Sequence, residues 1–445
     1  MGLSSDRPRQ RRPDCPNHST LSSKTVSVIM NQFNFLSLFN RDVSIPLNQL
    51  RQTASASETF SIEVTVSDVT TTSAQLDANS RAFLAAEYSR TPDFETLVGV
   101  RLAQADGPGD RRTINLTGLL PNQTYYYRLT DAEGNSEQGR FETLVDLGLP
   151  ATGDFVIFGD SLSDTGNLFL ALGQQQPPSP PYFQGRFSNG PVLPEWIAQR
   201  LGFAAPLPAL AGGSNYAVAG AQTGVGILPN GAPNVGQQIE SYLSQDRPES
   251  GDLFYLFAGA NDLIFAQRSP EAIADNLIDH ISTLAEAGAQ QFLVANLPDI
   301  GQLPAVVRQG QGEVLTGAVS ATNQALVARF EGLEQQFGIE ILELDIAGAF
   351  EEILENSQEL GFSQTTEPAL DPLTGEVVDN PEEYLFWDEI HPSTRTHELI
   401  TRVSLTELQS LEAPPLPEAD PPFGESESWL SQISELAIAD EAIMS

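Results

Sequence analysis

FVIFGDSL, residues 155–162, is the stretch that decides the fold of most of this chain. Its first four residues form a continuous apolar run that ends in Gly159, as in a strand buried on both faces of a parallel sheet. Residues 253–257 and 291–295 repeat this pattern. Between these two runs, residues 271–287 place four apolar side chains at helical spacing: Ile273, Leu277, Ile281 and Leu284. The alternation predicts an α/β domain, a mostly parallel sheet between layers of helices.

Residues 57–147 carry a different pattern, in which apolar and polar residues alternate as in half-exposed strands. The alternation begins at Phe60, Ile62, Val64 and Val66 and returns at residues 74–76, 83–88, 114–116, 125–129 and 141. Turn signals at residues 106–109 and 133–135 separate the runs. Several short strands within about 90 residues predict an all-β sandwich.

The segment GLLPNQTYYYRL, residues 118–129, resembles the tyrosine corner and following strand of fibronectin type III domains. In that family a tyrosine hydroxyl bonds back to the upstream backbone and pins the corner. Tyr125 matches that tyrosine, with Leu119 and Pro121 as its upstream partners. The resemblance implies an N-terminal fibronectin type III-like sandwich over residues 57–147.

The ends of the chain differ from both of these regions. Residues 1–56 are polar and rich in Ser, Gln and Arg, and we interpret them as a disordered leader. A short linker, Leu-Gly-Leu-Pro at residues 147–150, leads into the α/β domain, predicted over residues 148–410. Residues 411–445 are predicted to be an acidic, Pro-rich linker. Residues 426–444 fit one amphipathic helix, which is either a docked or frayed terminal helix or a secretion or interaction signal.

Composition excludes several classes of function. The chain has 445 residues, 22 Lys and Arg against 59 Asp and Glu, and a formal net charge of −37. Such a charge repels polyphosphate, which excludes nucleic acid as a main partner. The single cysteine, Cys15, excludes a disulfide framework and a cysteine-rich zinc site. The sequence contains no run of about 18 apolar residues, so no transmembrane helix is predicted. Neither Met1 nor Met30 begins a convincing signal peptide.

Ser161 is the first candidate for chemistry, because it follows the predicted strand 155–158 directly. A serine between a strand and a helix is expected to meet the free N–H groups at the start of that helix. Those donors and the helix dipole favour the negative charge that an acyl-transfer intermediate develops. The alternative is that Ser161 only caps the helix.

His391 is the second candidate, in the stretch DEIHP at residues 388–392. Serine catalysis needs an imidazole base, and that base needs a carboxylate to fix its tautomer. Asp388, three residues earlier on a predicted turn, can reach the Nδ1 atom of His391. The alternative is a surface histidine at a helix start. Of the other histidines, His18 lies in the leader, His280 is expected to be packed or solvated, and His397 is expected to be structural or to support the residues of the site.

Two further stretches could supply hydrogen-bond donors. Small residues surround Gly220 in NYAVAGA, residues 215–221, and allow close approach of backbone to a ligand. Asn261, in GAND at residues 259–262, follows the strand 253–257 and offers a neutral amide to a developing oxyanion. Each stretch is also explained by ordinary turn chemistry.

Taken together and in this order, the four elements resemble the diagnostic blocks of the GDSL lipase/esterase family, also called SGNH hydrolases. The likeness covers residues 153–405 and includes FGDSLSDTGN at 158–167, GRFSNGP at 185–191, NLPDIG at 296–301 and FWD at 386–388. It implies a three-layer, flavodoxin-like α/β/α fold. It also implies that Ser161 is the nucleophile, His391 the base and Asp388 its orienting carboxylate. The N–H groups of Ser161 and Gly220 and the amide of Asn261 would form the oxyanion hole.

The resulting hypothesis is a serine ester hydrolase that cleaves carboxylic esters, lipid esters among them, without a cofactor or metal. Esterase, phospholipase and acyltransferase activity remain open. The tract 173–183 is expected beside the site, where it lines an acyl pocket or packs as a plain loop, and Arg186 is expected to offset a phosphate headgroup. The alternative is a non-catalytic surface protein whose sandwich contacts carbohydrate or protein. Under either hypothesis, the protein is expected to be secreted or held at the cell surface.

Overall fold

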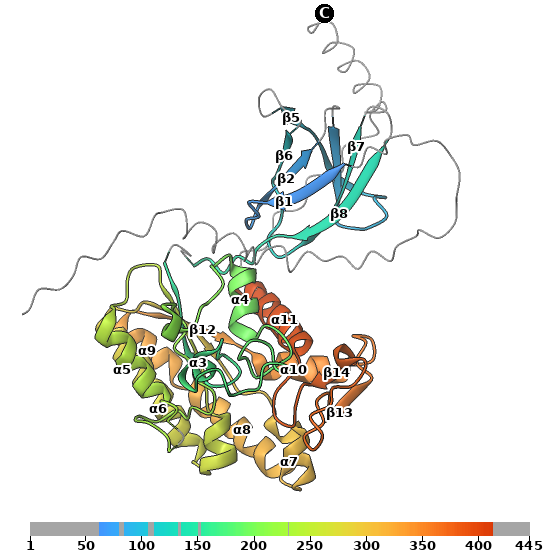
Figure 1. Ribbon diagram of the computed structural model, residues 1–445. Helices are drawn as coiled ribbons and strands as arrows, with labels where there is room; N and C mark the ends of the chain where they lie inside the picture. Colours follow the sequence, from blue (N-terminus) through green and yellow to red (C-terminus); the bar gives the residue numbers. More distant parts are fainter. Residues whose placement is uncertain are drawn as a thin grey trace, which may run out of the picture. The chain divides into compact units, whose positions relative to one another are not determined.

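The computed structural model describes residues 62–79, 84–105, 111–131, 135–149, 153–229 and 231–412 (Figure 1). The predicted leader at 1–56 and the predicted terminal helix at 426–444 lie outside the described residues. The described chain forms a region of antiparallel strands and a region of helices around a parallel sheet. The predicted boundaries of these domains stay predictions, although the last helix of the α/β region continues through Glu412, beyond the expected end at residue 410.

The β region contains two antiparallel four-stranded sheets, in the orders β1-β2-β6-β5 and β4-β3-β7-β8. Alternating burial along β7 shows how each sheet turns one face toward a shared apolar core, as the period-two sequence pattern predicts. The pattern missed β4 and β5. The strands are β1 Glu63–Ser67, β2 Ser73–Asn79, β3 Leu84–Ser89, β4 Leu97–Leu102, β5 Gln104–Ala105, β6 Arg111–Thr117, β7 Thr124–Asp131 and β8 Ser136–Glu142.

Tyr125 forms the expected corner with one difference in its partner. Its hydroxyl accepts a hydrogen bond from the backbone N–H of Leu120 at 2.9 Å, whereas the sequence resemblance pointed to Leu119 and Pro121. The ring is buried and stacks on Phe141 with 5.7 Å between centroids. A tyrosine held at both its ring and its hydroxyl fixes the path of the chain into β7.

The α/β region is built on four parallel strands in the order β12-β11-β10-β9. Three of them are the predicted apolar runs: β9 Phe155–Gly159, β10 Leu253–Phe257 and β11 Gln291–Ala295. The fourth, β12 Glu340–Leu344, was not predicted, because its two glutamates interrupt the apolar run and leave neither a continuous nor an alternating pattern. All four strands run in one direction, so their carboxyl ends share one edge of the sheet.

Helices cover this sheet in two groups, which gives the predicted three-layer α/β/α architecture (Figure 1). One group contains α5 Val235–Gln245, α6 Pro270–Ala287, α8 Gly312–Val327 and α9 Phe330–Phe337, and the other contains α4 Leu193–Leu201, α10 Ile346–Glu355 and α11 Thr394–Glu412. In α6 all four predicted apolar residues are buried, and the side chain of Ser269 caps its first turn. Within the described residues, no helix is both long and apolar enough to cross a membrane.

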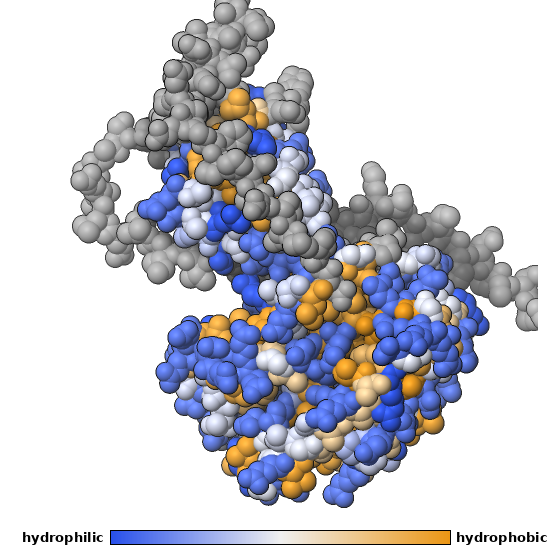
Figure 2. Space-filling view, turned by 180° about the vertical axis from the view of Figure 1, so that it is seen from behind, coloured by the Kyte–Doolittle hydropathy of each residue, from blue (hydrophilic) through white to orange (hydrophobic). Residues whose placement is uncertain are grey.

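Shorter elements connect the strands and helices around the carboxyl edge of the sheet. They are α3 Asn167–Ala171, η1 Ala209–Ala211, η2 Asp262–Ala266, η3 Ile300–Gln302, α7 Pro304–Arg308 and η4 Pro381–Glu383, with a parallel pair of β13 Gln364–Pro368 and β14 Tyr384–Phe386. Figure 2 shows that hydrophilic side chains predominate on the visible face of the α/β region, with smaller apolar patches between them.

Candidate active site

Ser161 lies just beyond β9, in a tight turn rather than at the start of a helix. The N–H groups of Ser163 and Asp164 both donate to the carbonyl oxygen of Asp160, at 3.1 and 2.9 Å. The next helix, α3, begins only at Asn167 and has five residues. The expectation that Ser161 lies at a helix N-terminus is therefore wrong. The N–H groups of Ser163 and Asp164 are used inside the turn, and the helix begins only after it.

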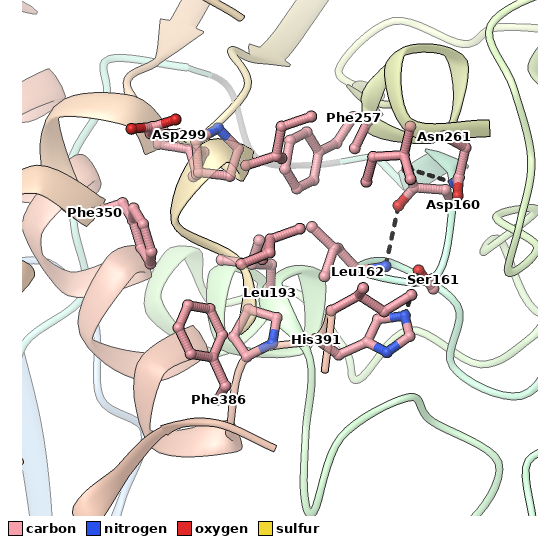
Figure 3. A pocket seen from close by; sticks show the side chains of 18 of the residues that line it. Asp160, Ser161, Leu162, Leu193, Phe257, Asn261, Asp299, Phe350, Phe386 and His391 are labelled. Atoms are coloured by element: carbon pink, nitrogen blue, oxygen red, sulfur yellow. Dashed lines mark hydrogen bonds between the residues drawn. The ribbon is translucent and has the colours of Figure 1, made fainter. Parts of the chain in front are cut away.

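His391 and Asp388 reach Ser161 from the loop that follows β14. The Nε2 atom of His391 lies 3.0 Å from the Oγ atom of Ser161, a contact drawn as a dashed line in Figure 3. The Nδ1 atom of His391 lies 2.8 Å from Oδ2 of Asp388. All three side chains are buried or nearly so. Residues 230 positions apart in the chain thus form one continuous hydrogen-bonded series.

The carboxyl group of Asp388 is held in its charged form. Its Oδ1 atom accepts hydrogen bonds from the backbone N–H groups of Ile390 and His391, at 2.9 and 2.8 Å. Burial alone would raise the pKa of Asp388, but the charge and hydrogen bond of His391, together with these donors, lower it instead. A charged carboxylate at this place favours an imidazole with its proton on Nδ1, which leaves Nε2 free to accept one from Ser161.

Asp160, next to Ser161, has the opposite character. Burial raises its pKa to about 7, against the hydrogen bond that it accepts from the N–H of Leu162 at 3.1 Å. Its other oxygen lies 3.3 Å from the amide Nδ2 of Asn261 (Figure 3). The same amide nitrogen donates to the carbonyl oxygen of Ala221 at 3.0 Å. Asn261 therefore reaches the site, but its amide is fixed by two protein acceptors.

Gly220 lies in a turn with a φ of 84°, which favours glycine, and it does not line the pocket beside Ser161. Its neighbours connect it to the site. Ala219 donates its N–H to Asp164 at 2.9 Å, and Ala221 accepts from Asn261. In the described part of the chain, the N–H groups of Ser161 and Gly220 donate to no protein acceptor.

A narrow pocket opens beside Ser161 and extends into the apolar interior. Ser161, Asn261, Asp160 and His391 lie at one end, and Phe350 lies at the other (Figure 3). The wall between them is mainly apolar and includes Leu162, Leu193, Phe257, Ile264, Leu303, Ile346, Phe386 and Ile400. The cavity volume is about 50 Å³. An acyl group of a few carbons fits this space without moving any side chain, since a single water needs about 10–15 Å³ by this measure.

The structure decides between the two alternatives for the neighbouring loop and corrects the expectation for Arg186. The aromatic residues of the tract 173–183 do not line this pocket; instead the hydroxyl of Tyr182 donates to Asp388 at 2.7 Å. Arg186 is buried and forms an ion pair with Glu195 at 2.8 Å. Since its guanidinium is already committed to this carboxylate, Arg186 is not free to bind a phosphate headgroup.

The remaining described histidines are structural, as expected, and His18 lies outside the described residues. His280 is buried with its Nε2 atom 2.6 Å from the carbonyl oxygen of Thr223. His397 is fully buried on α11, and burial lowers its pKa to about 3. Within the described residues, no three His, Cys, Asp or Glu side chains gather as a metal site would require.

Asp164 is a supporting residue that the sequence reasoning missed. Its carboxylate accepts the N–H groups of Gly166, Asn167 and Leu168 at the start of α3, as well as that of Ala219. It therefore joins the Ser161 turn to the Gly220 turn. Asp164 belongs to the stretch FGDSLSDTGN at residues 158–167, between Ser163 and Thr165. Its position there does not show which distant N–H group it binds.

A serine, a histidine and an aspartate in hydrogen-bond contact, at the carboxyl edge of a parallel sheet, are typical of α/β serine hydrolases. The sequence pattern of the GDSL-like lipase/acylhydrolase family matches residues 155–403, more than half of the chain. The chain belongs to this family and is an ester-bond hydrolase.

Two curated relatives illustrate the range of this family. A phosphatidylcholine-sterol acyltransferase of Aeromonas hydrophila is 29% identical over 314 residues, which cover 59% of this chain and 91% of the relative. A thermolabile hemolysin of Vibrio parahaemolyticus is 30% identical over 277 residues, which cover 58% of this chain and 64% of the relative. Among solved structures, an acetylxylan esterase of Geobacillus stearothermophilus covers 58% of this chain and 94% of its own, at 14% identity and a TM-score of 0.29.

Proposed function

We propose that this protein hydrolyses carboxylic esters of apolar acyl groups through a covalent acyl-enzyme on Ser161. The observation that carries the proposal is the series of contacts from Ser161 Oγ to His391 Nε2, at 3.0 Å, and from His391 Nδ1 to Asp388, at 2.8 Å. Both distances suit proton transfer and tautomer control in the ground state. The roles assigned to these residues are part of the proposal.

The reaction starts when Ser161 Oγ attacks the ester carbonyl carbon and passes its proton to His391 Nε2. Asp388 stabilises the imidazolium, and the collapse of the tetrahedral intermediate breaks the bond to the alcohol, which takes the proton from Nε2. Water then loses a proton to His391 and attacks the acyl carbon. Collapse of this second intermediate breaks the bond between the acyl carbon and Ser161 Oγ, which takes the proton back from Nε2 as the acid leaves. The proposed donors to the oxyanion are the N–H groups of Ser161 and Gly220, and the amide of Asn261 once it gives up its 3.3 Å contact with Asp160.

The acyl group, rather than the alcohol, is assigned to the pocket. Its wall is lined by Phe, Leu and Ile side chains, which recover hydrophobic free energy from each methylene that they cover, at about 0.8 kcal/mol per CH₂. The net charge of −37 disfavours acyl donors with anionic headgroups. Neutral or zwitterionic esters with short apolar acyl chains are therefore the proposed substrates.

A fluorophosphonate probe tests the nucleophile directly. Wild-type protein should be labelled at Ser161, identified by mass spectrometry of the modified peptide, and should hydrolyse p-nitrophenyl butyrate. Ser161→Ala should lose the label and at least about 10⁴ of kcat, because the members of such a triad act as a unit. Ser163→Ala, two residues away in the same turn, is the matched control and should keep the label. A Ser161→Ala variant with near-normal turnover would contradict the proposal.

A further inference from the structure

The segment 182–191, here called the strap, includes the GRFSNGP stretch that the proposed reaction leaves without a role. It is fastened to the catalytic loop at residues 388–394. The Ser188 hydroxyl donates to the carbonyl oxygen of Pro392 at 2.9 Å. Thr394 donates its N–H to the Asn189 side chain and its hydroxyl to the carbonyl oxygen of Pro191, both at 2.8 Å. The strap therefore holds the loop on which Asp388 and His391 lie.

Tyr182, at the start of the strap, contacts the proposed triad itself. Its hydroxyl donates to Oδ2 of Asp388 at 2.7 Å, the same oxygen that lies 2.8 Å from Nδ1 of His391. Besides the imidazole of His391, Asp388 accepts hydrogen bonds from backbone N–H groups of its own loop, at Ile390 and His391. Tyr182 thus gives Asp388 a donor from a segment about 200 residues away in the sequence.

Aromatic contacts fix the Tyr182 ring so that its hydroxyl points at the carboxylate. The ring packs edge-on against Trp387, with 6.0 Å between centroids, and against Phe187 at 5.9 Å. Phe187 in turn lies against the His391 ring at 5.1 Å. Burial and the neighbouring charge of Asp388 raise the pKa of Tyr182, so its hydroxyl stays protonated and remains a donor at any working pH.

We propose that Tyr182 is a positioning residue of the reaction: its hydroxyl holds the Asp388 carboxylate in the orientation that presents Oδ2 to His391. This inference rests on the proposed function. A hydrogen bond to a charged acceptor is stronger and more directional than one between neutral groups. Without it, the carboxylate gains freedom to turn about its χ2 angle, and the imidazole that it orients loses part of its alignment with Ser161.

Tyr182→Phe tests the hydroxyl alone, because it keeps the ring and its contacts with Trp387 and Phe187. We expect kcat for p-nitrophenyl butyrate to fall about tenfold while KM stays unchanged. The acid limb of the profile of kcat/KM against pH should move to higher pH, because a carboxylate relieved of one donor holds a proton on the imidazole more strongly. Tyr384→Phe, in the same aromatic cluster, is the matched control and should leave kcat and the acid limb unchanged.

The outcomes separate this inference from the function on which it rests. If wild type is labelled at Ser161 and hydrolyses the ester, but Tyr182→Phe matches it in kcat and in its acid limb, the positioning role is wrong and the proposed function stands. A lower melting temperature with an unmoved acid limb would show that Tyr182 serves only stability, which also overturns the inference. Wild type that neither takes the label nor hydrolyses esters would overturn both.

Discussion

The Ser161 turn at residues 160–164 and the catalytic loop at residues 388–394 each bring one buried aspartate to the same site, and the two carboxylates behave in opposite ways. The pKa of Asp388 is lowered and that of Asp160 is raised to about 7. Both side chains are largely withdrawn from water, so burial penalises the charged form of each. What differs is the set of groups that surrounds each carboxylate.

Asp388 is surrounded by donors: two backbone N–H groups, the Tyr182 hydroxyl and the imidazole of His391. Asp160 accepts one backbone hydrogen bond and one long contact from an amide, and the negative charge of Asp262 lies nearby. A sequence position beside Ser161 does not by itself make a carboxylate anionic. For Asp388 the charge and the hydrogen bond of His391 do so, together with the other donors that surround it.

The largest expected effect is the difference in kcat between the asparagine variants of the two aspartates. Asp388→Asn is expected to lower kcat by about 10⁴ at pH 7, because an amide no longer selects the imidazole tautomer with its proton on Nδ1. Asp160→Asn should lower kcat by no more than about tenfold, since Asp160 contacts Asn261 and not the imidazole. Both values come from steady-state hydrolysis of p-nitrophenyl butyrate, with circular dichroism to verify the fold. Equal losses in the two variants would refute the division of roles.

The sequence was sufficient for the elements with strong local signals. These elements are the apolar runs of β9, β10 and β11 and the helical spacing of apolar residues on α6. The structure confirms all four. The strands β4, β5 and β12 were missed, and all three lie at the edge of their sheets. In β4 and β12 one side is less buried and the pattern is mixed. Element type followed where the apolar pattern was regular, whether continuous, alternating or helical, and it was missed where the pattern was mixed.

The residues of the site could likewise be predicted from their local sequence, but not all of their partners. Ser161, Asp388, His391, Gly220 and Asn261 were predicted, and the structure brings the first three into contact, with Asn261 beside them. Contacts between distant segments could not be predicted. Nothing local to Tyr182 indicates that its hydroxyl meets Asp388, and nothing local to Arg186 indicates that Glu195 neutralises it. The type and sequence spacing of residues indicate their chemistry, whereas the hydrogen-bond or ion-pair partner of a side chain depends on how the loops pack.

The two aspartates should also give stability opposite dependences on pH, which is a smaller effect. A folded-state pKa of about 7 for Asp160, above its unfolded value near 3.8, means that the folded state binds the extra proton. Its contribution is therefore present at low pH and is lost as the pH rises from about 4 to 7. The lowered pKa of Asp388 acts in the other direction, since its contribution is present above the unfolded value and is lost as the pH falls through the folded one.

Urea unfolding of wild type and Asp160→Asn at pH 5 and pH 8 measures the Asp160 part. Between these pH values, the free energy of unfolding of wild type should fall by about 2 kcal/mol more than that of the variant. The new amide faces the amide of Asn261, but this cost does not depend on pH and cancels in the difference. Parallel pH dependences in the two proteins would mean that Asp160 is already ionised in the folded state at pH 5.

The smallest expected effect concerns the apolar end of the pocket, which lies opposite the two aspartates. Phe350→Leu removes part of the ring that closes this end (Figure 3) and should admit longer acyl chains. The ratio of kcat/KM for p-nitrophenyl octanoate over butyrate should rise about three- to tenfold, because each methylene newly accommodated is worth about 1 kcal/mol or more. Phe337→Leu on α9 packs against the same core but does not line the pocket, and it should leave the ratio unchanged. If both variants shift the ratio equally, the change reflects a loosened core and not a chain-length stop at Phe350, and the acyl group would then have to be assigned away from this end of the pocket.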